Sequence, residues 1–170
     1  MSWAQDAVFY HIYPLGFCGA PEYNDFANPV PRLDKLYDWI PHLKALGITA
    51  VYFGPVFQST RHGYDTADYY RVDSRLGDND SFARLCGALH QNGIRVVLDG
   101  VFNHVGRDFW AFQDVQKNGQ SSPYCGWFHN LNFGGPSPMG DPFWYDSWQG
   151  HYELVKLNLR NPDVVRHLLD

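Results

Sequence analysis

Residues 94–104 read Ile94-Arg95-Val96-Val97-Leu98-Asp99-Gly100-Val101-Phe102-Asn103-His104. The first five are β-branched or apolar apart from one arginine, and an Asp-Gly pair follows them. This composition predicts a strand buried on both faces. An acid, an amide and an imidazole then stand just past the end of the strand. In folds built on parallel strands, active sites form at that edge of the sheet. The stretch therefore indicates a parallel sheet with polar side chains at its carboxyl edge.

Two further runs have the same character and predict two more strands. Residues 8–13 are stopped by Pro14, and residues 48–53 are stopped by Gly54-Pro55. Between them, apolar residues recur every three or four positions, as on one face of a helix. They are Leu33, Leu36, Tyr37, Ile40, Leu43 and Leu46. We expect Gly47 to end this helix and Pro41 to kink it, because proline cannot donate to the carbonyl four residues back.

A second helix is expected before the 94–98 strand, and a third near the end of the chain. The second has an apolar stripe of Phe82, Leu85, Cys86 and Leu89. We expect Asp80 or Ser81 to cap its start and Gly93 to end it. The third begins after Asn161-Pro162. Its expected apolar face is Val164, Val165, Leu168 and Leu169.

The predicted order is β-α-β-α-β, then a long insert, then a helix. Such an order favours either a doubly wound sheet or a (β/α)8 barrel. No GxGxxG turn follows the first strand, which argues against a dinucleotide-binding fold. The insert runs from Val105 to Leu157 without clear periodicity, and its length is typical of a functional insertion or a small subdomain. We expect most of its tryptophans to form subdomain core and one or two to contact a substrate. They are Trp110, Trp127, Trp144 and Trp148.

Composition excludes several classes of protein. The chain has 170 residues, a net charge of −5 and 17% aromatic residues. Binding to nucleic acid is not expected, because no run of Lys or Arg offers a basic face. Cys18, Cys86 and Cys125 form no CxxC pair, and the histidines form no short-spaced ligand pair with them. No signal peptide and no apolar run of membrane-spanning length is visible, so we expect a cytoplasmic protein without a membrane partner.

Two groups of polar residues are candidates for a site. Asp99, Asn103 and His104 form the first. From chemistry alone, a purely structural role is an equally good interpretation, with Asp99 capping a turn and His104 a hydrogen-bonded, partly buried side chain. The second group follows the 48–53 strand and offers an aromatic ring among hydrogen-bonding groups. It comprises His62-Gly63-Tyr64-Asp65 and Asp68-Tyr69.

Together these motifs resemble the α-amylase family, glycoside hydrolase family 13. Residues 99–104 are similar to its first conserved motif, 47–55 to its second-strand motif, and 62–69 to the loop that follows. The insert contains two stretches similar to the sequences of the neopullulanase and cyclomaltodextrinase branch. They are residues 122–129 and Val155-Lys156-Leu157-Asn158. The similarities occur in family order over nearly the whole chain. The resemblance implies the first three β/α units of a (β/α)8 TIM barrel: 1–104 barrel, 105–157 an inserted subdomain B after the third strand, and 158–170 the start of the third barrel helix.

The resemblance also implies roles for single residues. Tyr64 would stack on the sugar ring next to the scissile bond, His104 would hydrogen-bond that sugar's primary hydroxyl, and Asp99 would orient neighbouring groups. Asn103 matches a position that binds a structural calcium in many amylases. In this branch calcium sits instead in a loop after the first strand. Here that loop, 16–25, has as oxygen-bearing candidates only Glu22, Asn24 and Asp25.

Retaining glycoside hydrolysis needs a nucleophile and an acid/base, two carboxyl groups about 5 Å apart. In the family both come from later strands, beyond the position matched by Asp170. We therefore expect the N-terminal segment of an α-glucan-acting hydrolase that contributes substrate-binding residues and is inactive alone. Its open strand edges predict dependence on the missing remainder of the barrel, or self-association. The alternative is a non-catalytic fragment that binds oligosaccharides or another protein.

Overall fold

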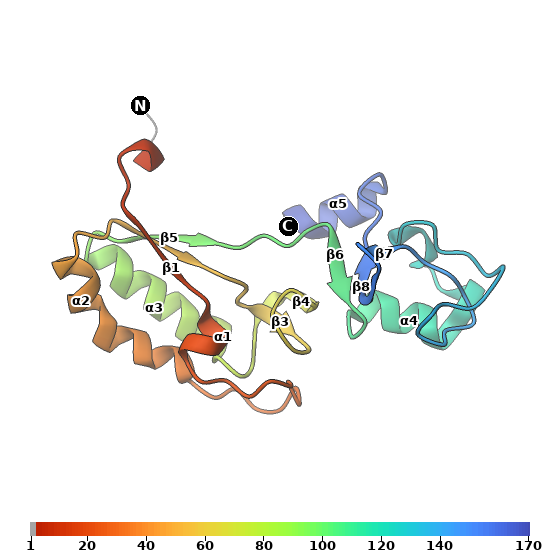
Figure 1. Ribbon diagram of the computed structural model, residues 1–170, viewed down its shortest axis with the longest axis horizontal. Coiled ribbons are helices and arrows are strands. Elements are labelled where there is room, and N and C mark those ends of the chain that lie inside the picture. The colour runs from red at the N-terminus through yellow and green to blue at the C-terminus, as the bar shows by residue number, and fades with distance from the viewer. Residues whose placement is uncertain (1–2) are drawn as a thin grey trace. The chain divides into compact units, whose positions relative to one another are not determined.

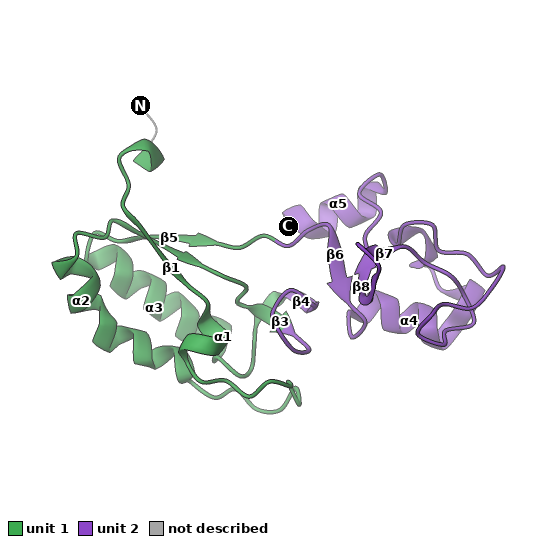
Figure 2. Ribbon diagram, viewed as in Figure 1, with its two compact units in different colours: residues 1–58, 70–100 green, residues 59–69, 101–170 purple. Residues whose placement is uncertain are grey.

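The computed structural model describes residues 3–170 (Figure 1). The chain folds as two compact units, coloured separately in Figure 2. Unit 1 comprises residues 1–58 and 70–100, and unit 2 comprises residues 59–69 and 101–170. The structure is α/β in character, and each unit has its own small sheet with helices packed nearby.

Unit 1 is built on a parallel sheet of three strands in the order β1-β2-β5. The strands are β1 Phe9–Ile12, β2 Ala50–Phe53 and β5 Arg95–Leu98. Phe9 pairs with Ala50 and Ala50 with Arg95, and the register continues without a shift. These strands confirm the three predicted runs, and their parallel pairing follows from the helical connections between them.

Helices cover one face of this sheet and bury its apolar side chains (Figure 1). The core contains Ile12 from β1, Val51 and Phe53 from β2, and leucines from the helices. β2 is the central strand and is almost wholly buried. β1 and β5 are edge strands, and their outer positions Phe9 and Leu98 are 46% and 37% exposed.

The first predicted helix is in fact two segments. A 3-10 helix, η2, spans Arg32–Trp39, and an α-helix, α2, spans Ile40–Ala45. Pro41 lies in the first turn of α2 and does not kink a continuous helix. The physical reason is that first-turn N–H groups have no partner within a helix, so proline loses nothing there. Gly47 follows with φ 72°, as expected of a residue that ends a helix.

The second predicted helix, α3, spans Asn79–Gln91, and its buried leucines are Leu85 and Leu89. Its cap is neither Asp80 nor Ser81 but Asp78, whose carboxylate accepts a hydrogen bond from the Ser81 N–H at 2.7 Å. The Ser81 hydroxyl in turn accepts from the Asp78 N–H. This reciprocal capping box places the helix start earlier than the apolar stripe indicated. Gly93, with φ 75°, follows the helix.

Several short elements of this part of the chain were not predicted. They are the 3-10 turn η1 Trp3–Gln5, the one-turn helix α1 Pro14–Phe17, and two strands that pair in a small sheet, β3 Phe57–Ser59 and β4 Thr66–Val72. η1, α1 and β3 have only three or four residues, over which periodicity is a weak signal. β4 has seven, but its buried and exposed positions do not alternate as in a strand with one buried face.

Unit 2 has an antiparallel sheet in the order β6-β8-β7. The strands are β6 His104–Gly106, β7 Ser147–Trp148 and β8 His151–Lys156. The helix α4, Trp110–Asn118, packs Phe112 against Phe128, Phe143 and Tyr145, which are all fully or almost fully buried. The segment without apparent periodicity therefore has an aromatic core. Two 3-10 turns complete it, η3 Gly119–Ser121 and η4 Cys125–Trp127.

The last helix, α5, spans Pro162–Leu169 and starts where it was predicted. Asn161 caps it by accepting a hydrogen bond from the Asp163 N–H at 2.9 Å. Of the expected apolar face, only Val164 is buried, whereas Val165 and Leu169 are 36% and 80% exposed. The physical reason is that only one side of this helix packs against the rest of unit 2, where His167 contacts the Trp127 ring. Val165 and Leu169 lie outside that contact. None of the helices in residues 3–170 is both long enough and apolar enough to span a bilayer.

Candidate functional site

Asp99 stands at the carboxyl end of β5, in unit 1. Its N–H donates to the Phe53 carbonyl at 3.0 Å, and its carboxylate accepts a hydrogen bond from the Tyr52 hydroxyl. Burial raises the pKa of Tyr52, and the Asp99 carboxylate raises it further. The Tyr52 ring also packs on His11 of β1, with ring centroids 4.9 Å apart. His11, Tyr52 and Asp99 thus form a polar row across the carboxyl edge of the sheet.

The row contains two residues that sequence reasoning missed, His11 and Tyr52. Strand alternation was the available signal. His11, Tyr52 and Val97 are opposite one another in the parallel register, and Asp99 lies two residues beyond Val97 on the same side. Helices cover the other face of the sheet, so these polar side chains share the face that unit 1 leaves uncovered.

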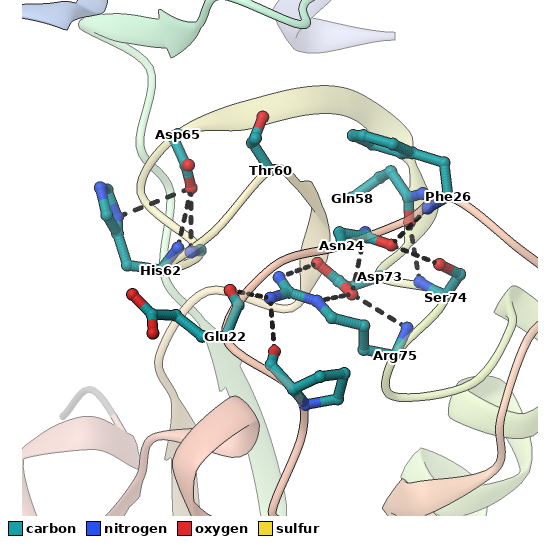
Figure 3. Close-up of polar contacts among 12 residues, drawn as sticks. Glu22, Asn24, Phe26, Gln58, Thr60, His62, Asp65, Asp73, Ser74 and Arg75 are labelled. Carbon is teal, nitrogen blue, oxygen red and sulfur yellow. Dashed lines mark hydrogen bonds and ion pairs between the residues drawn. The ribbon is translucent and has the colours of Figure 1, made fainter.

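The second group of residues belongs to unit 2 and forms a tight turn from His62 to Asp65. Gly63 has φ 93°, which glycine adopts without strain. The Asp65 carboxylate accepts hydrogen bonds from the N–H groups of His62 and Gly63, both at 3.1 Å (Figure 3). Burial raises the pKa of Asp65, and His62 and these N–H groups act against that rise. Because its carboxylate is committed to the turn, Asp65 shapes the loop that carries Tyr64.

His104 lies directly against this turn. Its Nε2 is 3.0 Å from the Tyr64 carbonyl oxygen, and its Nδ1 contacts the Asn103 side-chain amide. One neutral tautomer satisfies both contacts, with Nε2–H donating to Tyr64 and Nδ1 accepting from Asn103. Burial lowers the pKa of His104, which favours this uncharged form. The structure therefore brings Tyr64, Asn103 and His104 together, while Asp99 belongs to the other unit.

A tryptophan completes the surroundings of His104. The Trp148 ring packs on the imidazole, with centroids 5.5 Å apart and planes tilted by 32°. Tyr64 and Trp148 are 40% and 37% exposed, whereas His104 is only 5% exposed. Two partly exposed aromatic rings thus lie near a buried imidazole. Trp127, in contrast, is core, with 8% of its surface exposed.

These residues line a pocket of about 360 Å³, and a more polar pocket of about 370 Å³ is lined by the same turn. Glu153 lines both. Its carboxylate is 3.5 Å from His151 Nδ1 and largely exposed. Neither His151 nor Glu153 was predicted to be a site residue. Their alternation within a short strand-like run was the signal that could have placed both on one face.

Close packing of two backbones holds the Tyr64 turn against β6. A Cβ atom at Gly106 would lie 2.5 Å from the Asp65 carbonyl oxygen and 2.8 Å from its carbonyl carbon. Only glycine permits this approach, since the neighbouring atoms are backbone and cannot rotate away. Gly106 therefore fixes the position of the turn relative to His104, two residues earlier in the same strand.

An ion pair between Arg107 and Asp141 stabilises the segment that follows β6. Arg107 donates to both carboxylate oxygens of Asp141, at 2.8 and 2.9 Å, and also to the Tyr145 hydroxyl at 2.6 Å. Burial alone would raise the pKa of Asp141. Hydrogen bonds from Arg107, Ser137 and Gln116 outweigh burial and lower it to about 2. The bidentate pair ties the 137–141 turn to the strand that carries His104.

The loop after β1 corresponds to the calcium position of the branch that this sequence resembles, and its few oxygen-bearing side chains do not fit that ion. Arg75 donates to the carbonyl oxygens of Pro21 and Glu22, at 3.0 and 2.8 Å. It also forms a buried pair with Asp73, with both side chains at most 3% exposed (Figure 3). Calcium needs six to eight oxygen ligands. Here a guanidinium already donates to two carbonyl oxygens of the loop, which makes them less available to an ion. Within residues 3–170, no three His, Cys, Asp or Glu side chains gather as metal ligands.

Comparison with known proteins agrees with this architecture. The family description "Alpha amylase, catalytic domain" matches residues 20–170. The chain is 40% identical to a cyclomaltodextrinase from a Bacillus species and 37% identical to neopullulanase 2 from Thermoactinomyces vulgaris. Each match covers 99% of this chain, and 33% and 31% of those proteins. The chain thus spans about a third of the length of the curated relatives it matches.

Solved structures give the same result. The cyclic α-maltosyl-(1→6)-maltose hydrolase of Arthrobacter globiformis superposes with a TM-score of 0.84 and 36% identity, over 99% of this chain and 41% of that one. A debranching enzyme from Nostoc punctiforme superposes with a TM-score of 0.80 and 35% identity, over 98% of this chain and 38% of that one. The resemblance found in the sequence is confirmed, and the chain belongs to the α-amylase family, with relatives in its cyclomaltodextrinase and neopullulanase branch.

Proposed function

We propose that this chain is the sugar-binding N-terminal segment of an α-glucan-acting retaining glycoside hydrolase. Family membership supports the chemistry, and the pocket around His104 carries the proposal for this segment. Two partly exposed aromatic rings, Tyr64 and Trp148, line this pocket together with a buried neutral imidazole. Flat apolar rings suit the C–H faces of a pyranose, and the polar edge suits its hydroxyl groups.

In this proposal each residue has a separate task. Tyr64 stacks on the sugar ring next to the scissile bond. The Nε2–H of His104 is shared between the Tyr64 carbonyl and the primary hydroxyl of that sugar. Asn103 orients the imidazole, since its amide contacts Nδ1. Asp99, hydrogen-bonded to Tyr52, presents a carboxylate at the carboxyl edge of the parallel sheet.

The fold assignment is part of the same proposal. We take β1, β2 and β5 as the first three strands of a (β/α)8 barrel, residues 105–157 as a subdomain inserted after the third strand, and 158–170 as the start of the third barrel helix. The exposed edge positions of β1 and β5 support further strands on both sides. We also propose that the protein is cytoplasmic, and the similarity to an intracellular maltogenic amylase of Bacillus subtilis supports this location.

We propose that the nucleophile and the acid/base lie outside these 170 residues. Of the carboxylates that line the two pockets, Asp65 accepts two N–H groups of its own turn, and Asp108 accepts from the side chains of Thr60 and Gln113. A carboxylate committed in this way is a poor nucleophile or proton donor. Glu153 is exposed, but the chemistry needs a pair about 5 Å apart, and neither pocket has a second carboxylate without such hydrogen bonds to accompany it. The chain alone is therefore expected to bind α-glucan oligosaccharides without cleaving them.

The test combines binding and turnover. We expect maltoheptaose to bind the purified chain and Tyr64→Ala to weaken that binding about tenfold or more, because loss of a stacking ring removes about 1.4 kcal/mol. Tyr70→Ala is the matched control, since Tyr70 is 47% exposed and lies outside this pocket. Reducing-sugar release from maltoheptaose or a cyclodextrin should stay at background. Release of reducing sugar by the chain itself would overturn the proposal that its catalytic carboxylates lie outside these residues. Equal loss of affinity in Tyr64→Ala and Tyr70→Ala would overturn the role of Tyr64.

A non-catalytic oligosaccharide binder remains the second candidate. The same pocket supports it, because binding needs only the aromatic walls and the polar edge. The two candidates differ when the remaining part of a relative's catalytic domain is supplied in trans. Restored cleavage supports the enzyme segment, and binding without restored cleavage supports the binder.

A further inference from the structure

Phe26 has a backbone conformation that a phenylalanine rarely adopts. Its φ is 55°, in the left-handed region, and its side chain is 45% exposed. A bulky residue in this region is an outlier that surrounding structure must enforce. The ring is nearly half exposed and does not belong to the hydrophobic core. The conformation instead presents an aromatic ring at the surface.

A buried hydrogen-bond network enforces this conformation (Figure 3). The Phe26 N–H donates to the Asn24 side-chain oxygen at 2.9 Å, and the same oxygen accepts from the Ser74 hydroxyl at 3.0 Å. The Asn24 amide nitrogen donates to Asp73, the carboxylate held by Arg75. Asn24 is only 8% exposed. The ring is therefore attached to a rigid support rather than to a free loop.

Phe26 forms part of the wall of a cavity of about 620 Å³ within unit 1. The loop after β1, strand β4 and the start of α3 contribute the other walls. Five of the lining side chains are polar and exposed, and two of them, Asp78 and Asn79, already make hydrogen bonds within the fold. The other three are Asn28, Arg71 and Asp80. Within residues 3–170, neither Arg71 nor Asp80 is engaged by an ion pair or a side-chain hydrogen bond. The cavity thus combines an aromatic face with polar groups that are available to a ligand.

The charges of these groups narrow the class of ligand. A phosphate or carboxylate would meet two carboxylates, Asp78 and Asp80, for one guanidinium, Arg71, so repulsion exceeds attraction. For a metal cation, the Asp78 carboxylate already accepts the Ser81 N–H, so attraction to Asp80 is opposed by repulsion from Arg71. A neutral polyhydroxylated molecule has no such conflict, since its hydroxyl groups donate to Asp80 and accept from Arg71 and Asn28. Its ring C–H groups would cover Phe26. The volume is within the usual range for small-molecule sites, about 300–1,000 Å³.

We propose that this cavity, which we call the Phe26 pocket, is a second, non-catalytic binding site for an oligosaccharide. That the oligosaccharide is an α-glucan rests on the proposed function. The Phe26 pocket and the pocket around His104 have no lining residue in common. The two sites can therefore be removed separately by mutation. A second site would hold a long glucan to the protein while another part of it occupies the site of cleavage.

The experiment measures maltoheptaose binding to the full chain by titration calorimetry, in wild type and four variants. Phe26→Gly removes the ring and suits φ 55°, so its thermal midpoint should not fall. Phe26→Trp keeps an aromatic face and is the conservative control. Arg71→Met tests the polar wall, since Arg71 is exposed and outside the core. Tyr64→Ala removes the site of the proposed function.

We expect two sites in wild type and in Phe26→Trp, and one in Phe26→Gly, with affinity at the lost site reduced at least about tenfold. Arg71→Met should weaken the same site. Two unaltered sites in Phe26→Gly would overturn the proposal, as would a single wild-type site abolished only by Tyr64→Ala. A single site abolished only by Phe26→Gly would uphold the Phe26 pocket and overturn the role of Tyr64. Absence of any binding would overturn both.

Discussion

The Nε2 atom of His104 lies 3.0 Å from the carbonyl oxygen of Tyr64, forty positions earlier in the chain. This single contact links the motif after β5 to the turn between β3 and β4. It also explains why an imidazole at 5% exposure is stable there, because the neutral ring forms a hydrogen bond with this carbonyl group.

Replacing His104 should separate its structural from its binding role. We expect His104→Ala to destabilise the chain by about 1–3 kcal/mol, because the Tyr64 carbonyl loses its donor. His104→Gln can still donate from its amide and should retain most of the stability. Urea unfolding measures both. Equal stability of wild type and His104→Ala would show that the contact contributes nothing.

His104 should also make stability depend on pH. Burial lowers its pKa in the folded chain below its usual value of 6.5, so the unfolded chain binds the proton more readily. This contribution to stability is complete above pH 6.5 and decreases as the pH falls toward the folded pKa. Unfolding free energies between pH 8 and pH 5 should therefore decline less in His104→Gln than in wild type. Parallel curves would contradict the assignment.

Gly106 should tolerate no side chain. In Gly106→Ala the new Cβ would meet the Asp65 carbonyl at 2.5 Å, and we expect a loss of about 1–3 kcal/mol with weaker maltoheptaose binding. Gly87→Ala is the matched control, because Gly87 lies inside α3 with nothing within 4 Å of an added Cβ. It should stabilise the chain by about 0.5–1 kcal/mol. If the two variants have the same effect on the thermal midpoint, the close approach is not tight.

Asp141 should contribute to acid resistance. Its pKa is lowered from 3.8 to about 2, so its stabilising effect is complete above about pH 4 and is lost as the pH falls through about 2. The corresponding free energy is about 2 kcal/mol. Asp141→Asn should be less stable at neutral pH and should show a shallower decline between pH 4 and pH 2. A wild-type acid profile in Asp141→Asn would contradict this.

Arg75 should be indispensable to the loop after β1. Arg75→Met leaves Asp73 buried without its partner, and we expect a loss of about 3–5 kcal/mol. Added calcium should not restore the midpoint of Arg75→Met, and a chelator should not change that of wild type. A chelator-sensitive wild type would show that an ion, and not the guanidinium, holds the loop.

The exposed edges of the parallel sheet should make the chain self-associate. Val8 is 51% exposed beside β1, and a lysine there should hinder edge-to-edge pairing. We expect sedimentation equilibrium to show concentration-dependent association in wild type and less in Val8→Lys. Leu159→Lys is the control, since Leu159 is 49% exposed but belongs to no strand. A monomeric wild type that unfolds cooperatively would contradict the prediction.

Local pattern determined much of this protein. Strands β1, β2 and β5 follow from short β-branched and aromatic runs stopped by proline or glycine, and α3 follows from the spacing of Leu85 and Leu89. Family membership could also be read from the motifs, because they are contiguous stretches of sequence. The predictions from periodicity were wrong where a single residue outside the apolar stripe determined the start of a helix. Asp78 begins α3 ahead of its apolar positions, and Pro41 begins α2 where an unbroken helix was expected.

Tertiary structure alone decided the contacts between residues far apart in the sequence. His104 and Tyr64, Arg75 and the carbonyl groups of Pro21 and Glu22, and Trp148 and His104 meet only after the chain has folded. The strained backbone of Phe26 belongs with them, because Asn24 holds it only through Asp73 and Ser74. Periodicity reports which face of an element is apolar, and it carries no information on which distant side chain will complete a hydrogen bond. Those pairings depend on how the elements pack, and they determine which polar groups are paired within the fold and which remain available to a ligand.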